Sequence, residues 1–253
     1  MHAGEMNLIS RRVFGSLTTA STAVCLSPRI VKSAAEWSVD LSDGWKVKQK
    51  LDSVVRIKAQ TVLQASLPEM GLEMKVTKIP LGITAASAFT SEDQLLLARY
   101  FSSDDSRYGP NDVAEAMVRS LQAQADTQRS TLRALYPATD GQPPTGLKRV
   151  DPTDAVTRRY VKYAYDSNTC RSVDLDGVCE GSPVRRNHVA SVTVNLETQA
   201  RTLAEKQMMD SGDMERRQID VLWLCTLSAP TAKWGQASSI ATRTLDSFVV
   251  QSM

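Results

Sequence analysis

Leu222-Trp223-Leu224-Cys225-Thr226-Leu227 is a nearly continuous apolar run with the length of a single strand. Such runs are typical of strands that are buried on both faces, so we expect this one at the centre of a sheet. Two alternating segments precede it, at 158–165 (RRYVKYAY) and 188–194 (HVASVTV). Alternation with a period of two predicts that both are strands of the same sheet.

The first half of the chain adds two strand patterns and one helix pattern. Residues 72–79 (LEMKVTKI) are interpreted as a fully alternating, half-buried strand, and 95–101 (LLLARYF) as a more apolar, more central one. Residues 112–126 have apolar side chains at helical spacing, and Asn111 is a good N-cap for that helix. Residues 53–66 fit a helix or a strand, and the sequence does not decide between them.

A second helix pattern lies near the end of the chain, where apolar residues recur at 237, 240, 241, 245 and 248. Strands that cluster along the sequence, without strict alternation of strands and helices, favour an α+β fold with a mainly antiparallel sheet. The same lack of alternation argues against a Rossmann fold.

Composition bounds the class of protein. The chain has 253 residues, of which 42% are hydrophobic and 23% charged, and this suits one globular domain with or without a targeting segment. The formal net charge is +2, which does not indicate a protein dedicated to nucleic acid.

Side chains that could carry catalysis are few. The chain holds two His and four Cys, with neither a CxxC pair nor several His to bind zinc. A G-x-S-x-G nucleophile motif and the glycine-rich motifs that hold phosphates are also missing from the sequence. We therefore expect a protein that is not an enzyme and has no intrinsic cofactor.

Residues 1–35 contain the parts of an export signal in the correct order. Arg11-Arg12 precedes a mild apolar run over 15–26, and the small residues Ser33-Ala34-Ala35 follow. The apolar run is about 12 residues long, and a bilayer-spanning helix needs about 20. We expect a twin-arginine signal that is removed near Glu36; the alternative is an ordinary amphipathic N-terminal helix.

The remaining chain, 36–253, is expected to be a single domain with two loop insertions. Residues 137–153 are rich in Pro and Gly and predict a long loop. Residues 196–218 are polar and heavily charged, so we expect an excursion that lies outside the core.

Several motifs in the C-terminal part of the chain point to one family. They are 159–165 (RYVKYAY), 188–194 (HVASVTV), 224–234 (LCTLSAPTAKW, with the turn A-P-T-x-x-W) and Asp246-Ser247-Phe248. Weaker matches lie upstream at 43–45 (DGW) and 108–113 (YGPNDV). Together these stretches resemble the PsbP family of thylakoid-lumen proteins, which includes the extrinsic subunit of the oxygen-evolving complex.

The resemblance implies an α/β/α sandwich around a central antiparallel sheet, in a chloroplast protein peripheral to the lumenal face of the thylakoid membrane. It implies a non-catalytic partner of a photosystem core and of other lumenal extrinsic subunits. The first expectation is a photosystem II subunit that helps retain Ca²⁺ and Cl⁻ for water oxidation. The alternatives are a photosystem assembly or accessory factor, and a small-molecule carrier on the same fold.

The resemblance also selects candidate site residues. His188 matches a metal-contact position of the family, but the family's partner Asp is Thr231 here, so the pair is incomplete. Basic residues on neighbouring segments are candidates for docking to acidic lumenal loops; the alternative is that these charges are scattered and solvated. The docking candidates are Lys148, Arg149, Arg158, Arg159, Lys162, Arg185 and Arg186.

Cys170 and Cys179 lie in the polar hairpin between the strands at 158–165 and 188–194. Asp176-Gly177 offers a turn between them, and a hairpin of this length brings two Cα atoms to within about 6 Å. The thylakoid lumen can be oxidising enough to keep the bond. We expect a Cys170–Cys179 disulfide and a buried free thiol at Cys225; the alternative is two unpaired surface thiols.

Overall fold

The computed structural model describes residues 29–32, 37–50, 59–82, 89–102, 107–124, 130–135, 145–149, 157–176, 178–198, 200, 202–216 and 218–251. A large sheet contains β3 (Lys46–Lys50), β4 (Gln60–Leu67), β5 (Leu72–Pro80), β6 (Ser130–Leu135), β7 (Thr145–Arg149), β8 (Thr157–Thr169), β9 (Val184–Thr198) and β10 (Gln218–Pro230). A small sheet contains β1 (Arg29–Lys32), β2 (Trp37–Leu41) and β11 (Val249–Val250). All pairings between these strands are antiparallel.

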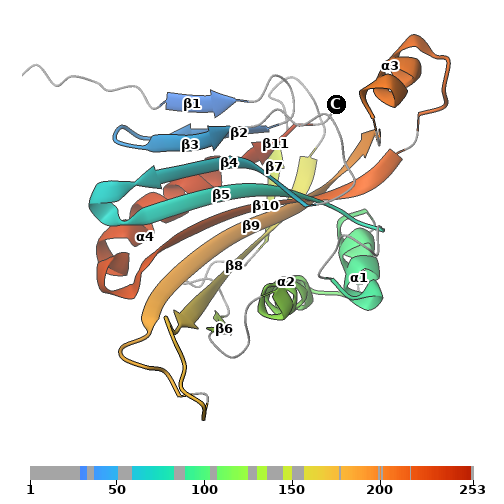
Figure 1. The fold of residues 1–253 in the computed structure, drawn as a ribbon. Coiled ribbons are helices and arrows are strands. Elements are labelled where there is room, and N and C mark those ends of the chain that lie inside the picture. The colour runs from blue at the N-terminus through green and yellow to red at the C-terminus, as the bar shows by residue number, and fades with distance from the viewer. Residues whose placement is uncertain are drawn as a thin grey trace, which may run out of the picture.

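The large sheet has the order β3-β4-β5-β10-β9-β8-β6, with β7 also paired to β8. The helices are α1 (Ser91–Ser102), α2 (Pro110–Gln124), α3 (Leu203–Ser211) and α4 (Thr231–Ser247), with a short 3₁₀ turn η1 (Pro68–Met70). One face of the large sheet packs on α4 and the other on α1 and α2 (Figure 1). The expected α/β/α sandwich around an antiparallel sheet is therefore confirmed.

Alternating side chains of the long strands divide the interior into two cores. On β8, Val161, Tyr163 and Tyr165 are buried toward α1 and α2, whereas Tyr160 and Ala164 are buried toward α4. The apolar run 222–227 lies in β10, between β5 and β9, so its predicted central place is confirmed. Both of its faces are buried because each face meets a different helical layer.

The small sheet closes the α4 side of the molecule and brings distant parts of the chain together. The backbone N–H of Val250 in β11 donates to the Tyr160 hydroxyl at 2.7 Å, and that of Asp40 in β2 donates to Ser247 Oγ at 2.9 Å. Trp37 and Phe248 are fully buried beside these bonds.

No described helix is long and apolar enough to cross a membrane.

The predicted strand at 95–101 is wrong, because these residues lie in α1. The buried positions Asp93, Leu96, Leu97 and Tyr100 follow the i, i+3, i+4, i+7 spacing of a helix, and Leu95 is 47% exposed. The Thr90 hydroxyl accepts from the Asp93 N–H at 3.1 Å and caps the first turn. The apolar run fits a strand by composition, but the capping Thr90 before it indicates the start of a helix.

Other boundaries also differ from expectation. The predicted helix 112–126 begins at Pro110, and the Asp112 carboxylate accepts from the Gly109 N–H at 2.6 Å, so Asn111 is not the N-cap. The undecided stretch 53–66 includes all but the last residue of β4, a strand. The strand β7 lies within the loop predicted at 137–153.

The excursion at 196–218 is only partly outside the core. Its first residues belong to β9, which continues to Thr198, and its centre forms α3. The leader prediction falls mostly on residues outside those described; its described part, β1, pairs with β2. Removal of a leader near Glu36 would take β1 with it.

Candidate functional site

A groove of about 400 Å³ lies on the α1 and α2 side of the large sheet, where β4 and β5 extend beyond the helices (Figure 1). Its floor is built by side chains that alternate along β5 and β10, and Met117, Ser120 and Leu121 of α2 form part of its wall. Gln64 and Glu73 are exposed there, because no described helix covers this half of the face. The groove lining includes Gln60, Gln64, Glu73, Lys75, Thr77, Ile79, Phe89, Tyr165, His188, Leu224, Thr226 and Ser228.

One end of the groove is a row of polar side chains that crosses four strands. Glu73 of β5 is paired in register with Ser228 of β10, which is paired with His188 of β9, which is paired with Tyr165 of β8. Farther along the floor, Leu224 and Ile79 pack in one apolar cluster with Phe89 and with Met117 of α2, so the lining changes from polar to apolar. Such a gradient suits a ligand with one polar and one apolar end.

Arg186 ties the polar end together. Its Nη2 atom donates to the Ser228 carbonyl at 3.2 Å and to Ser228 Oγ at 3.0 Å, and it lies 3.2 Å from Glu73 Oε2. These contacts link β5, β9 and β10 at the mouth of the groove. Glu73 itself is exposed, so its ion pair contributes little to stability.

His188 is packed rather than free. Its ring stacks on Tyr165 with a centroid separation of 4.3 Å and an interplanar angle of 8°, and its Nε2 atom lies 2.7 Å from Ser167 Oγ. Burial, and secondarily the positive charge of Arg186, lowers the pKa of His188 to about 4. The imidazole is therefore neutral at physiological pH.

The Ser167–His188 contact does not make a hydrolytic pair. An imidazole activates a hydroxyl by accepting its proton, and this requires basicity near neutral pH. With a pKa of about 4, His188 is too weak a base for that role.

The predicted metal contact at His188 gains no partner in the described part of the chain. Thr231 begins α4, which covers the opposite face of the sheet. Cys179 is bonded to Cys170. Among the described residues, no group of three or more His, Cys, Asp or Glu side chains is placed to hold a metal ion.

The predicted basic residues are not gathered on one face. Arg159 of β8 lies on the α1 side, where it donates to the Tyr100 carbonyl at 2.9 Å and stacks over the Tyr100 ring. Lys162 lies on the α4 side and pairs with Asp246. Alternation along one strand separates them, because residues three apart on a strand point to opposite faces.

Of the other basic residues, Arg185 and Arg186 have described side chains, and both belong to β9. Arg186 lies at the mouth of the groove, and Arg185 is exposed on the neighbouring position of β9. The backbones of Lys148 and Arg158 are paired in register between β7 and β8, next to Arg149. The side chains of these last three residues lie outside those described.

Two charge clusters were missed from the sequence. The first is a buried ion pair, in which Lys78 Nζ of β5 lies 2.6 Å from Glu197 Oε2 of β9, and both side chains are at most 2% exposed. Trp223 Nε1 donates to Glu197 Oε1 at 2.7 Å, and Lys78 lies over the Trp223 ring. The sequence could have revealed this buried lysine. Lys78 lies two residues after Val76 and four after Met74, so it shares their buried face of β5.

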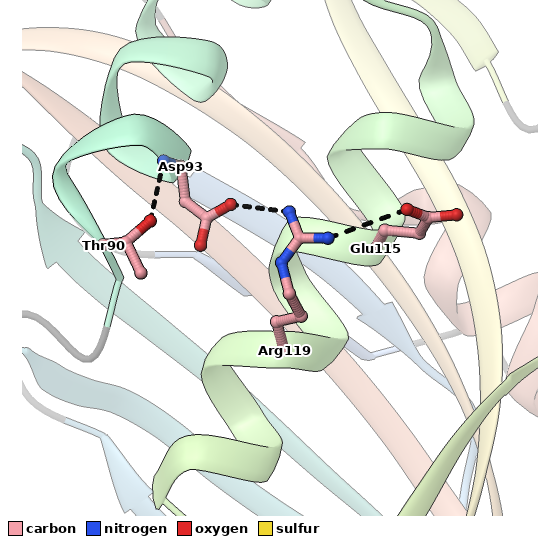
Figure 2. Close-up of polar contacts among 4 residues, drawn as sticks. All are labelled: Thr90, Asp93, Glu115 and Arg119. Carbon is pink, nitrogen blue, oxygen red and sulfur yellow. Dashed lines mark hydrogen bonds and ion pairs between the residues drawn. The ribbon is translucent and has the colours of Figure 1, made fainter.

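The second cluster holds α1 against α2 (Figure 2). Arg119 Nη2 of α2 lies 2.7 Å from Asp93 Oδ1 of α1, while its Nη1 lies 3.6 Å from Glu115 Oε2. Asp93 is 5% exposed, and its hydrogen bond is the main reason that the pKa of Arg119 is raised. This contact fixes α1 against α2, and α2 forms part of the groove wall.

The hairpin between β8 and β9 is closed by a disulfide. The Cα atoms of Cys170 and Cys179 are 5.5 Å apart and their sulfurs are bonded. Cys225 is a buried free thiol in β10. This is the arrangement that hairpin geometry led us to expect.

No family model matches the chain, and no curated protein matches it. Among solved structures, the chain is similar to the solution structure of cyanobacterial PsbP (CyanoP) from Synechocystis sp. PCC 6803. The TM-score is 0.44 and the sequence identity 12%, over 93% of this chain and 99% of the cyanobacterial one. Likeness at this level assigns neither a family nor a function.

Proposed function

We propose that the chain is a PsbP-like protein of the thylakoid lumen that docks peripherally on a photosystem and has no catalytic activity. The observation that carries this proposal is the place of the family-like motifs at junctions of the sandwich. Ala229 and Pro230 end β10, Thr231 begins α4, and Trp234 packs against the core beside them. The A-P-T-x-x-W motif therefore forms the corner at which the central strand passes into the covering helix.

Two further motifs occupy equivalent junctions. Asp43-Gly44-Trp45 forms the turn before β3, where Gly44 has a φ of +88° and Trp45 is buried. Gly109-Pro110 starts α2, and a Pro at the first helical position is favoured because its missing N–H has no partner to lose. In both motifs, the residue at the junction suits the backbone there: Gly44 adopts a positive φ, and Pro110 starts a helix.

The finer proposal is a photosystem II subunit that supports Ca²⁺ and Cl⁻ retention indirectly. A protein of this kind would act as a cover on the photosystem core and on other lumenal subunits, restricting exchange of ions with the lumen. The protein's own residues need hold no ion for that role. The twin-arginine leader would deliver the folded chain to the lumen.

Protease protection tests the location. In intact thylakoids the protein should resist added protease, and it should become sensitive when the membranes are sonicated. A wash with about 1 M salt should release it, since exposed charges are screened at that ionic strength. Digestion in intact thylakoids, or retention through the wash, would contradict peripheral lumenal docking.

The groove supports a second candidate, a small-molecule carrier. Its volume of about 400 Å³ is within the range of ligand pockets, and its lining runs from polar to apolar. Native mass spectrometry of the protein purified from its own membranes decides this. A stoichiometric small-molecule adduct lost on replacing Leu224→Gln would favour a carrier, and the bare mass alone would exclude it.

A further inference from the structure

Two apolar side chains lie uncovered on the tip of the β8–β9 hairpin, which we define as residues 170–176 and 178–180. Leu175 is fully exposed and Val178 is 60% exposed. The hairpin projects beyond the end of the large sheet, because the neighbouring strand β10 ends at Pro230, opposite Arg186 (Figure 1). The described body of the protein therefore does not cover either side chain.

The hairpin tip is held rigid by bonds that leave these two side chains pointing outward. The Asp174 carboxylate accepts from the N–H of Asp176 at 3.0 Å and of Val178 at 2.8 Å. The Asp174 N–H donates to the Val178 carbonyl at 2.9 Å, and the Cys170–Cys179 disulfide closes the base. An apolar pair on a preorganised loop loses little conformational entropy on binding, which is the property of an anchor.

The mainly negative charge around the tip indicates what kind of surface the partner presents. Asp174, Asp176 and Glu180 are exposed carboxylates and Arg171 is the one exposed basic residue between the two cysteines. Such a rim is repelled by an anionic lipid surface and attracted by basic residues. The apolar pair therefore calls for an apolar socket on a protein with a basic edge.

We infer that the hairpin tip is a docking anchor, in which Leu175 and Val178 insert into an apolar, basic-rimmed socket on a partner protein. The inference rests on the proposed photosystem docking and adds the surface that makes the contact. Binding needs the disulfide, because reduction would free the loop between the cysteines. The tip thus couples docking to the oxidised state of the hairpin.

Rebinding to salt-washed thylakoid membranes tests the anchor. Leu175→Ser with Val178→Ser should raise the apparent Kd about tenfold or more, as expected when a central apolar anchor is lost. The matched control is Leu203→Ser with Met208→Ser on α3, which are 59% and 41% exposed at the opposite end of β9. The control should bind within about twofold of the wild type.

Two further variants test the rest of the inference. Cys170→Ser with Cys179→Ser should weaken binding several-fold while leaving circular dichroism of the folded domain unchanged. Asp176→Asn with Glu180→Gln should weaken binding mainly at low salt, where the attraction between these carboxylates and the basic edge of the socket is not screened. Equal binding by the tip variant and the wild type would overturn the anchor.

Other occupants have their own outcomes. Leu175-dependent binding to vesicles containing anionic lipid would overturn the protein socket, and so would a Leu175-dependent dimer in sedimentation. If the wild type does not bind the membranes at all, the proposed function itself is contradicted and the anchor falls with it. If the wild type and the tip variant bind the membranes equally well, only the anchor is contradicted and the proposed function stands.

Discussion

Lys78 and Glu197 are buried so completely that neither charge retains contact with water. Their attraction offsets the cost of removing both charges from water, and Trp223 adds a hydrogen bond to the carboxylate and an aromatic face to the ammonium. Breaking one side of such a pair leaves an uncompensated buried charge. Replacing both sides together does not.

Lys78→Met should therefore destabilise the fold by about 3–5 kcal/mol in urea unfolding, because Glu197 is left buried without its cation. Lys78→Met with Glu197→Gln should recover most of that loss, since Gln keeps an acceptor for Trp223. Lys75→Met is the matched control, an exposed lysine on the same strand, and should change stability by less than about 0.5 kcal/mol. Equal effects of Lys75→Met and Lys78→Met would refute the buried pair.

His188 predicts a pH dependence. Its folded pKa of about 4 lies below the ordinary value of about 6.5, so between these values the unfolded chain binds a proton that the folded chain rejects. The contribution of His188 to the free energy of unfolding is fully present above about pH 6.5, and roughly 3 kcal/mol is lost as the pH drops through this window. His188→Gln should lack this component of the acid loss in urea unfolding. An imidazole that titrates near pH 6.5 by NMR would contradict the assignment.

At the scale of elements, the packing of α1 on α2 depends mainly on the contact between Arg119 and Asp93, and little on the contact between Arg119 and Glu115. Asp93 is buried beneath Arg119, whereas Glu115 is exposed and lies farther from the guanidinium. Arg119→Met should cost about 1–3 kcal/mol by leaving the Asp93 carboxylate without its charge partner, and should speed hydrogen exchange in α1. Glu115→Gln should cost less than about 0.5 kcal/mol. The opposite order would mean that the surface pair holds the helices.

The β8–β9 hairpin predicts a thiol count. Protein that begins near Glu36 contains Cys170, Cys179 and Cys225. Denatured without reductant, it should react with a thiol reagent once, at Cys225, because the other two are bonded. Three reactive thiols would exclude the disulfide.

Elements whose periodicity is complete were predictable, and the failures have physical causes. The alternation of β8 and β9 fixed which side chains enter each core, as the burial of Tyr163 and Ala190 confirms. The run at 95–97 misled because three consecutive leucines fit both periods, and only the Thr90 cap distinguishes them. The interpretation of 72–79 as fully alternating overlooks Lys78, a charged residue in line with the buried Met74 and Val76.

The groove and its polar row could not be predicted from the sequence, for another reason. Glu73, Ser228, His188 and Tyr165 come from four strands that are far apart in the chain, and only the register of the folded sheet aligns them. Spacing within the predicted strand already places Arg159 and Lys162 on opposite faces, but it does not reveal their partners in α1 and α4. Pairing between distant strands is a property of the tertiary fold.

At the scale of the whole molecule, the two long hairpins of β8, β9 and β10 give the protein two opposite ends. The disulfide-closed tip lies at one end of β9 and α3 at the other (Figure 1). Between them, the cores on the two faces of the sheet make a rigid body that can carry an anchor to a distant surface. This shape suits docking through the disulfide-closed tip.

Native electrophoresis of mildly solubilised thylakoids, followed by immunodetection, tests the central claim most directly. Photosystem docking predicts that the protein comigrates with a photosystem core, with photosystem II for the finer proposal, and that salt washing moves it to the position of the free protein. Comigration confined to partly assembled complexes would favour the assembly factor. Migration only as free protein before any salt wash would contradict docking on a photosystem.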